Sequence, residues 1–402
     1  MTVPATLDDL PRIDRRPVGM DDHAYLRLCR SKGPLAIDRY GFVWVFSHAD
    51  MLTCTDPTLT RQVETEKAQA LGVRDGPVFE YFANSLLFSN GRVHERRRRP
   101  LSKAFAFRVV AGFRPLIRQI VRDLIDACDG HSEVDFLNEF AARLPAQVIG
   151  GILGVPSQDI PHVAALVDGA MRALSLRPSQ MTEAAVEALA ELDGYVTAVL
   201  AERRSAPQDD FLSGFARMAE QDGLTEIEAR VQITSVILAG SDTTRMALCS
   251  TLAQLLQDQR QWEDLAADPD GLVVGAVAEG LRYDPVIGSL PRVAITDFDL
   301  QGVRIPADTV IAPVIVSILR DPEVYDQPDR FDIRRTDHPR YHPVFGAGVH
   351  RCLGEALARA ELEEALIALA EWAPTIRLAG PPPILSGVSG ARTIDQMAVS
   401  FG

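Results

Sequence analysis

Apolar residues recur with a helical period over most of the chain that follows residue 110. This pattern, interrupted mainly by Gly, Pro and Asp, predicts helices at 115–128, 136–151, 157–174, 181–204, 225–257, 271–283 and 353–372. A run rich in β-forming residues, with Gly41 near its turn, predicts a hairpin over 35–46, and short strands are expected within 292–316. The pattern predicts a mainly α fold with a small β portion. Because no repeat or low-complexity linker marks a boundary, we expect one domain over residues 1–402.

The segment 225–257 is the longest predicted helix. Its 33 residues would span about 50 Å at 1.5 Å per residue, which is long enough to cross a whole domain. The middle of the segment, 231–240, is apolar nearly all round, which indicates burial. Glycine and hydroxyl residues in 240–244 are expected to interrupt the helix and permit a kink. A core helix that tolerates small residues is the plain alternative, but Asp242 would then be a buried carboxylate, which is costly without partners.

The composition is that of a packed globular protein, with 47% hydrophobic and 24% charged residues. A net charge of −14 argues against binding to nucleic acid, which requires basic surface. The first residues lack the basic and apolar regions of a signal peptide, and no run of about 18 apolar residues predicts a membrane span. Five scattered cysteines fit a reducing compartment, so we expect a cytoplasmic protein.

The strongest chemical signal is the segment 345–354, Phe-Gly-Ala-Gly-Val-His-Arg-Cys-Leu-Gly. It brings Cys352 to the first turn of a predicted amphipathic helix, where free backbone N–H groups and the helix dipole stabilise a thiolate. A lone buried cysteine is more often structural, but this spacing matches the pattern F-G-x-G-x-H-x-C-x-G. The segment therefore resembles the haem-thiolate loop of the cytochrome P450 family.

Three further segments extend the resemblance over about 90–360. The stretch 239–244 resembles the family's oxygen-binding stretch on its long central helix, and Glu279 with Arg282 resembles its E-x-x-R element. The segment 95–98 also matches E-x-x-R, but only 279–282 lies between the other two motifs as the family requires. The segment 90–98 is the remaining match. The resemblance implies the cytochrome P450 fold, with the long central helix crossing the domain over haem.

The resemblance implies haem b (iron protoporphyrin IX) bound through Cys352, whose thiolate favours O–O bond cleavage. Buried propionates need charge-assisted partners, and the residues that match the family's propionate donors are His94, Arg98, Arg292 and His350. A solvated helix face is the alternative for Arg98, since four arginines run together at 96–99. The other implied cofactor contacts are Phe345, Gly346 and Gly354. Glu279 and Arg282 are implied to form a buried structural ion pair, with Arg330 as its third member.

On the opposite side of the haem, the resemblance implies that Asp242 and Thr243 are the catalytic pair that delivers protons during oxygen activation. The positions that match the family's substrate contacts are Val78, Phe79, Phe82, Val236, Ala239, Gly240, Val286, Ile287 and Ser289. This mostly apolar set suits an apolar small molecule. Terpenoid, aromatic, fatty-acid and macrolide substrates all remain open.

The expected function is a haem-thiolate monooxygenase that inserts one atom of dioxygen into an apolar substrate. The chain ends about 50 residues after the Cys352 helix begins, so electrons are expected from a separate ferredoxin with its NAD(P)H-dependent reductase. The basic residues expected to attract an acidic ferredoxin are Arg96, Arg97, Arg99, Arg108 and Arg351. Solvation of a helix or pairing with local acids is the alternative for this cluster. A peroxygenase, an isomerase or a non-catalytic haem-binding sensor are the alternative functions.

Overall fold

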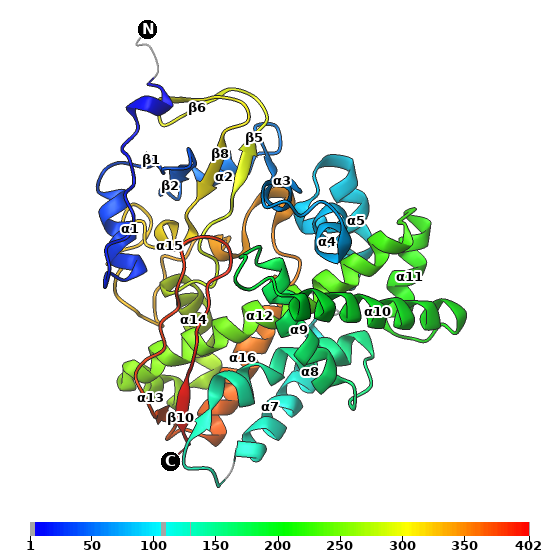
Figure 1. Cartoon of the computed structure of the whole chain (residues 1–402). Helices are drawn as coiled ribbons and strands as arrows, with labels where there is room; N and C mark the ends of the chain where they lie inside the picture. The colour runs from blue at the N-terminus through cyan, green and yellow to red at the C-terminus, as the bar shows by residue number, and fades with distance from the viewer. Residues whose placement is uncertain (1–4, 106–109, 129, 402) are drawn as a thin grey trace.

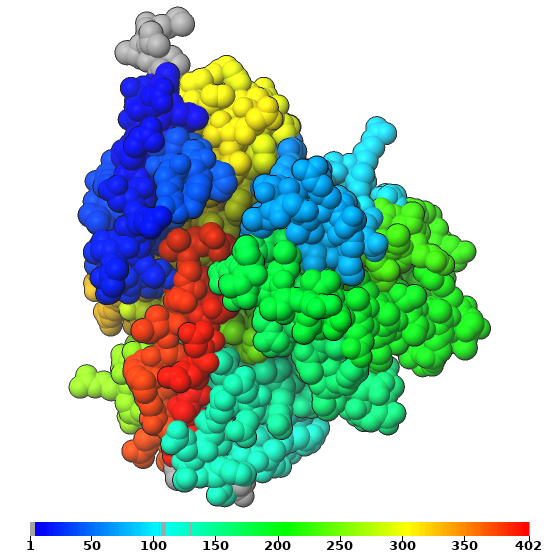
Figure 2. Space-filling model, viewed as in Figure 1, coloured from blue at the N-terminus to red at the C-terminus, as the bar shows by residue number. Residues whose placement is uncertain are grey.

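The computed structural model describes residues 5–105, 110–128 and 130–401. Helices fill most of the molecule, and most strands gather at the end where the chain begins (Figure 1). In the space-filling view, the N-terminal segment lies beside the segment around residue 300 at this end (Figure 2). The predicted mainly α fold with a small β portion is confirmed.

The β-rich end contains a five-stranded sheet. Across the sheet, the strands are β1 (Leu35–Ile37), β2 (Val43–Val45), β8 (Val310–Pro313), β5 (Arg292–Ala294) and β3 (Thr60–Gln62). β1 and β2 form the predicted hairpin, with Ala36 opposite Trp44, and β2 pairs in parallel with β8. The remaining strands are the hairpin β6 (Phe298–Leu300) and β7 (Val303–Ile305), and the sheet of β4 (Val134–Asp135), β10 (Ala398–Ser400) and β9 (Arg377–Leu378).

The helices that the periodicity predicts are present. They are α7 (Arg114–Cys128), α8 (Arg143–Leu153), α9 (Ile160–Leu174), α10 (Glu183–Ser205), α12 (Glu226–Gln257), α14 (Pro269–Tyr283) and α16 (Glu355–Trp372). The predicted helix 136–151 is divided, because a π-helix over Phe136–Ala141 precedes α8. The further helices are α1 (Asp22–Arg30), α2 (Met51–Cys54), α3 (Glu66–Ala70), α4 (Gly76–Asn84), α5 (Gly91–Ala104), α11 (Phe211–Gln221), α13 (Gln259–Ala267) and α15 (Ile315–Ile318). Among the described residues, no helix is long and apolar enough to span a membrane.

α12 passes through the middle of the helical region, beside α16 (Figure 1). It begins at a capping box, in which Thr225 Oγ1 accepts a hydrogen bond from the Glu228 N–H and the Glu228 carboxylate accepts one from the Thr225 N–H. The expected interruption at 240–244 is wrong, since α12 is helical throughout. The Ser241 and Thr243 hydroxyls donate to the carbonyls of Ile237 and Ala239, each at 2.7 Å, so they bond to the turn before them without breaking the helix.

Candidate active site

A cavity of about 320 Å³ lies between α12 and the segment that leads into α16. Its α12 wall consists of Ser235, Val236, Ala239, Gly240, Thr243, Thr244 and Ala247. The other wall is formed by residues 344–347 and 350–354 and by Leu357, Ala358, Glu361 and Leu362 of α16. The cavity thus brings together the two motifs that the sequence analysis placed more than 100 residues apart.

The segment before α16 has the conformation that its glycines permit. Gly346 and Gly348 have φ values of +71° and +65°, a region that residues with a Cβ rarely adopt. The backbone turns back on itself, so that the Cys352 N–H donates to the Phe345 carbonyl at 2.8 Å. Cys352 follows directly and lines the cavity, as Phe345, Gly346 and Gly354 do.

The Cys352 sulfur lies within the protein but faces open space. The residue is exposed, because the cavity beside it is wide enough to admit solvent, yet protein atoms surround it on its other sides. Burial raises the pKa of its thiol, while the Gly354 N–H and the charges of Arg98 and Arg351 act in the opposite direction. The backbone donor expected at the start of α16 is therefore present, but in the protein alone burial has the larger effect.

Four potential cations meet at one edge of the cavity without an acidic partner. His94 and Arg98 come from α5, Arg292 from β5 and His350 from the loop, and the two imidazole rings lie 4.0 Å apart. We call these four residues the cationic cluster. Arg98 donates to the Arg351 carbonyl at 2.7 Å, and Arg292 donates to Thr60 Oγ1 at 3.2 Å. Within the part of the chain that the structure describes, none of the four forms an ion pair with Asp or Glu.

Burial and mutual repulsion determine the ionisation of the cationic cluster. Burial, reinforced by the charges of Arg98 and Arg292, lowers the pKa of His94 to about 4. Burial likewise lowers the pKa of Arg292 to about 10. The His94 Nε2 atom is buried and has no hydrogen-bond partner. A polar atom left in this state calls for an acceptor or donor from outside the chain, and the two anionic propionates of haem match both the charge and the place. The residues present therefore fit haem.

The predicted catalytic pair divides between two environments. Thr243 lines the cavity, whereas Asp242 is buried beside it, and its Oδ1 accepts a hydrogen bond from Arg245 Nη2 at 2.5 Å. The carboxylate that the sequence analysis found hard to justify thus has a partner one turn along α12.

Only some of the predicted substrate-contact residues lie at the cavity. Val236, Ala239, Gly240, Val286 and Ile287 line the cavity. Val78, Phe79, Phe82 and Ser289 do not. Phe82 packs into the core instead, with its ring 4.6 Å from that of Phe88. The cavity residues that the sequence did not reveal include Leu86, Leu87 and Ile149. The apolar run 86–88 is a signal in the correct segment, but periodicity does not reveal which of its side chains face the cavity.

Glu361 is a second feature that the sequence analysis missed. It lies on α16, lines the cavity, is fully buried, and its Oε2 atom has no hydrogen-bond partner. Burial raises the pKa of this carboxyl group well above its usual 4.5.

Glu279 and Arg282 form the expected pair, with both side chains completely buried. Arg282 donates to Glu279 at 2.6 and 2.8 Å and to three backbone carbonyls. The third ionic member is Arg335, whose Nε lies 3.2 Å from Glu279 Oε2, and the prediction of Arg330 is wrong. Arg330 contributes only its carbonyl, because its side chain is largely exposed and pairs with Asp332.

The expected basic cluster is largely paired internally. Arg96 and Arg97 both bind Glu228, at 2.5 and 3.0 Å, and Arg97 is only 6% exposed, so its place in a docking patch is wrong. Arg99 binds Asp222 while remaining exposed, and Arg351 binds Glu355. Arg108 lies outside the described residues.

Comparison with known proteins places the chain in a family. The family profile described as Cytochrome P450 matches residues 162–371. The plant-inducible cytochrome P450-pinF1 of Rhizobium radiobacter is 40% identical, over 95% of this chain and 90% of that protein. The erythromycin C-12 hydroxylase of Saccharopolyspora erythraea is 32% identical, over 90% of this chain and 88% of that protein.

Solved structures agree with this assignment. CxnD, a cytochrome P450 enzyme for C–S bond formation in chuangxinmycin biosynthesis, superimposes with a TM-score of 0.85 and 31% identity over 98% of each chain. P450BioI, solved in complex with an acyl carrier protein that carries hexadec-9Z-enoic acid, has a TM-score of 0.84 and 26% identity, over 94% of this chain and 97% of that one. These matches cover nearly the whole chain, and the chain therefore belongs to the cytochrome P450 family, as one of its monooxygenases.

Proposed function

We propose that this monooxygenase binds haem b through Cys352 and inserts one atom of dioxygen into an apolar organic substrate. The observation that carries the proposal is one cavity with opposite chemistries on its walls. Cys352 and three members of the cationic cluster line one part of it, and Thr243 and a largely hydrocarbon surface line another. When bound, thiolate-ligated haem supplies the activation of dioxygen.

The cationic cluster would hold the two propionates. Arg98 and Arg292 each have guanidinium N–H groups beyond those used in their present hydrogen bonds, and His94 has its unpartnered Nε2. An anion at this place would favour the charged forms that burial now disfavours, and charge-assisted hydrogen bonds are the stronger class. Haem binding would therefore favour the charged forms of the cationic cluster, and the charged forms would in turn strengthen haem binding.

The substrate wall favours an apolar guest. Leu86, Leu87, Val236, Val286 and Ile287 present hydrocarbon to the cavity. The Ser235 hydroxyl on the same wall lies 3.0 Å from Ser85 Oγ, so it is already engaged. Binding would therefore be driven mainly by burial of apolar surface, and the shape of the wall would determine orientation.

Thr243 and Asp242 would move protons into the cavity. The Thr243 hydroxyl now donates to the Ala239 carbonyl, and rotation about its C–O bond would point the same proton into the cavity. Asp242 is held by Arg245, whose side chain is 20% exposed, so breaking this pair would bring the carboxylate toward solvent. The pair would thus connect the cavity to the outside by side-chain rotation alone.

The ligand assignment is tested by spectroscopy of the reduced protein with carbon monoxide. The Soret band should have the thiolate position in wild type and lose it in Cys352→His. Cys249→Ala is the matched control, because Cys249 is fully buried in α12 and burial raises the pKa of its thiol. A thiolate band that survives Cys352→His, or disappears in Cys249→Ala, would refute the assignment.

The proton-delivery role is tested by product formed per NAD(P)H consumed. Thr243→Val removes the hydroxyl with little change of shape, and NAD(P)H consumption should continue while hydrogen peroxide replaces product. Thr251→Val is the control, since Thr251 is buried on the same helix but does not line the cavity. Asp242→Asn should slow turnover by about 10²–10⁴-fold, the usual range for acid–base groups. Unchanged coupling in Thr243→Val would contradict the proposal.

We further propose that an acidic ferredoxin supplies electrons near the segment that precedes α16. With Arg97 excluded, the exposed cations of α5 include Arg99 and Lys103. Lys103→Glu should slow electron transfer and weaken its dependence on salt, because rim charges act mainly on association. Arg330→Glu is the control at an exposed site remote in sequence. Equal electron-transfer rates in the two variants would count against this docking site.

A further inference from the structure

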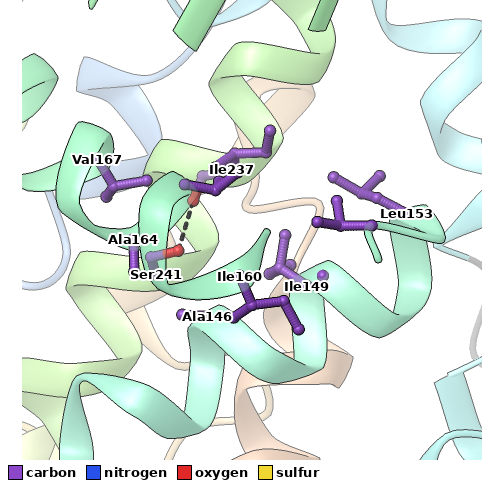
Figure 3. A pocket seen from close by; sticks show the side chains of 11 residues that line it. Ala146, Ile149, Leu153, Ile160, Ala164, Val167, Ile237 and Ser241 are labelled. Atoms are coloured by element: carbon purple, nitrogen blue, oxygen red, sulfur yellow. Dashed lines mark hydrogen bonds between the residues drawn. The ribbon is translucent and has the colours of Figure 1, made fainter. Parts of the chain in front are cut away.

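Two sides of the active-site cavity are supported by different kinds of contact. Behind Ile149, side chains of α9 and α12 such as Ile160 and Ile237 surround a void of only about 10 Å³, so this side is closely packed hydrocarbon (Figure 3). Val286 and Ile287 form another side of the cavity. The contacts that hold this second side are polar.

The segment that carries Val286 and Ile287 pairs with the chain near the C-terminus. Ile287 lies opposite Ala391 in an antiparallel bridge, and the Arg392 N–H donates to the Val286 carbonyl at 2.8 Å. The position of this part of the wall therefore depends on the position of the C-terminal segment.

Gly288 allows the two segments to approach closely. A Cβ atom at this position would lie 2.6 Å from the Val388 carbonyl carbon and 2.7 Å from the Ser389 nitrogen, which is closer than Cβ atoms come to other atoms in proteins. The Gly288 N–H donates to the Gly390 carbonyl at 2.7 Å. Because no side chain separates the two backbones, a shift of one segment would displace the other.

The Arg392 side chain, which is only 1% exposed, joins the two segments a second time. Its Nη1 donates to the Pro285 carbonyl at 2.9 Å, directly before the cavity residue Val286, and its Nη2 donates to the Leu385 carbonyl at 2.7 Å. A guanidinium group presents its N–H groups in a rigid planar fork. These two bonds therefore fix the spacing between the segments.

Two carboxylates from distant parts of the chain hold the guanidinium group in place. Asp284 Oδ1 lies 2.5 Å from Arg392 Nη1, and Asp22 Oδ2, in the first turn of α1, lies 3.5 Å from Nη2. Asp22 also accepts a hydrogen bond from the Gly387 N–H at 2.8 Å. Burial raises the pKa of Asp284, but Arg392 and His23 outweigh it, so that the pKa lies below its usual value. The guanidinium group is thus buried with its own counterions.

We propose that Arg392 is a positioning residue that fixes the wall at Val286 and Ile287 and thereby orients the substrate, although Arg392 itself does not line the cavity. The inference rests on the proposed function, because it concerns an apolar substrate in the haem cavity. An apolar guest is oriented mainly by the shape of the wall, so the wall must keep a defined position.

Arg392→Lys is the variant that tests this role. It keeps the positive charge between the two carboxylates, but one ammonium group cannot reproduce the planar fork of a guanidinium group. Arg203→Lys is the matched control, because Arg203 is also buried and binds the carboxylates of Asp210 and Glu202 on a different part of the fold.

Hydrogen exchange of the haem-loaded protein measures how firmly the two segments are held. In Arg392→Lys, the amides of 284–290 and 385–393 should exchange about tenfold faster than in wild type, because local opening becomes easier. In Arg203→Lys they should exchange at the wild-type rate. Unchanged exchange of these segments in Arg392→Lys would overturn the proposal, as would an equal increase over the whole chain.

The effect on the cavity is measured with two probes that ligate haem iron, imidazole and phenylimidazole. Imidazole reports on the iron alone, whereas the phenyl group extends into the cavity and reports on its apolar wall. Phenylimidazole should bind about tenfold more weakly to Arg392→Lys than to wild type, with the affinity for imidazole unchanged. Arg203→Lys should match wild type with both probes. Equal losses of affinity for the two probes in Arg392→Lys would overturn the positioning role.

Asp22→Asn repeats both measurements if Arg392→Lys does not fold. It removes one of the two carboxylate charges while leaving the guanidinium group in place, so the changes should be of the same kind and smaller. Wild-type exchange and wild-type affinities in Asp22→Asn would then overturn the proposal. A wild-type protein that binds neither imidazole nor phenylimidazole would instead refute the haem assignment and leave the exchange result valid.

Discussion

Two groups of basic side chains in the described part of the chain differ in whether they contain their own anion. Around Glu279, Arg282 and Arg335 share a carboxylate, and Arg282 also donates to the carbonyls of Leu319, Pro328 and Arg330. The cationic cluster, in contrast, has only carbonyl and hydroxyl acceptors among the described residues, and His94 Nε2 has no partner there. The first group is electrostatically complete within the chain, and the second is not.

This difference separates a structural site from a binding site. A buried charge that lacks a counterion is strongly disfavoured, so a fold that keeps one indicates a charge supplied by something else. The Glu279 group links α14 to residues 319–335 and holds the chain in place. Three members of the cationic cluster, Arg98, Arg292 and His350, line the cavity, where we propose that an anionic ligand balances their charge.

The largest effect is expected from Glu279→Ala. Two arginines would remain buried without a carboxylate, and removing one partner of a buried pair typically costs about 3–5 kcal/mol. Glu191→Ala, at an exposed pair with His162, should cost about 0–1 kcal/mol. Chemical denaturation of both variants gives the measurement. If the two variants lost similar amounts of free energy of unfolding, the Glu279 group would not stabilise the fold more than a surface ion pair does.

Arg292→Leu should have an intermediate effect and depend on the cofactor. Without haem it should leave the free energy of unfolding unchanged or higher, because it removes a buried cation that has no counterion. With haem it should lose a charge-assisted hydrogen bond of about 1.5–3 kcal/mol, so that haem dissociates about 10–100 times faster. Arg61→Leu on the neighbouring β3 is the control, since Arg61 pairs with Glu66. If Arg292→Leu destabilised the haem-free and the haem-bound protein equally, the cationic cluster would be structural, as the Glu279 group is.

Glu361 is a buried acid whose Oε2 atom has no hydrogen-bond partner among the described residues. We therefore expect the stability of the protein to depend on pH through this residue. Burial raises the pKa of its carboxyl group in the folded protein, so its contribution to stability is full below pH 4.5 and declines as pH rises toward the folded pKa. Glu361→Gln removes this titration. The free energy of unfolding of the variant, relative to that of wild type, should therefore rise by up to about 1.4 kcal/mol for each pH unit above 4.5. Thermal unfolding of both proteins between pH 4.5 and 8 measures the difference. A difference that does not change with pH would show that Glu361 has a partner in solution.

The smallest effect is expected at Arg99. Its side chain is 61% exposed and pairs with Asp222 on the surface, so Arg99→Ala should cost about 0.2–1 kcal/mol. Arg97→Ala, only two residues away, should cost more, because Arg97 is buried against Glu228 and also donates to the Ala83 carbonyl. Equal losses in the two variants would mean that burial does not distinguish these neighbours.

The features that could be predicted from the sequence are those encoded over a few residues. The apolar period of 225–257 determines a long buried helix, and the glycines of 346–354 allow the turn that brings Cys352 to the cavity wall. His94 and Arg98 also lie four residues apart, so their common helix face follows from helical geometry alone.

The features that needed the folded molecule depend on contacts between distant segments. Arg97 is paired because Glu228, 131 residues away, packs against α5. Arg335 replaces Arg330 at Glu279 because its side chain turns inward, with only 6% of its surface exposed. Leu86 and Leu87, rather than Val78 and Phe82, reach the cavity, since the packing of α4 buries the latter pair in the core. Local periodicity specifies which residues share a face, whereas the neighbour of that face is chosen by the packing of the whole chain.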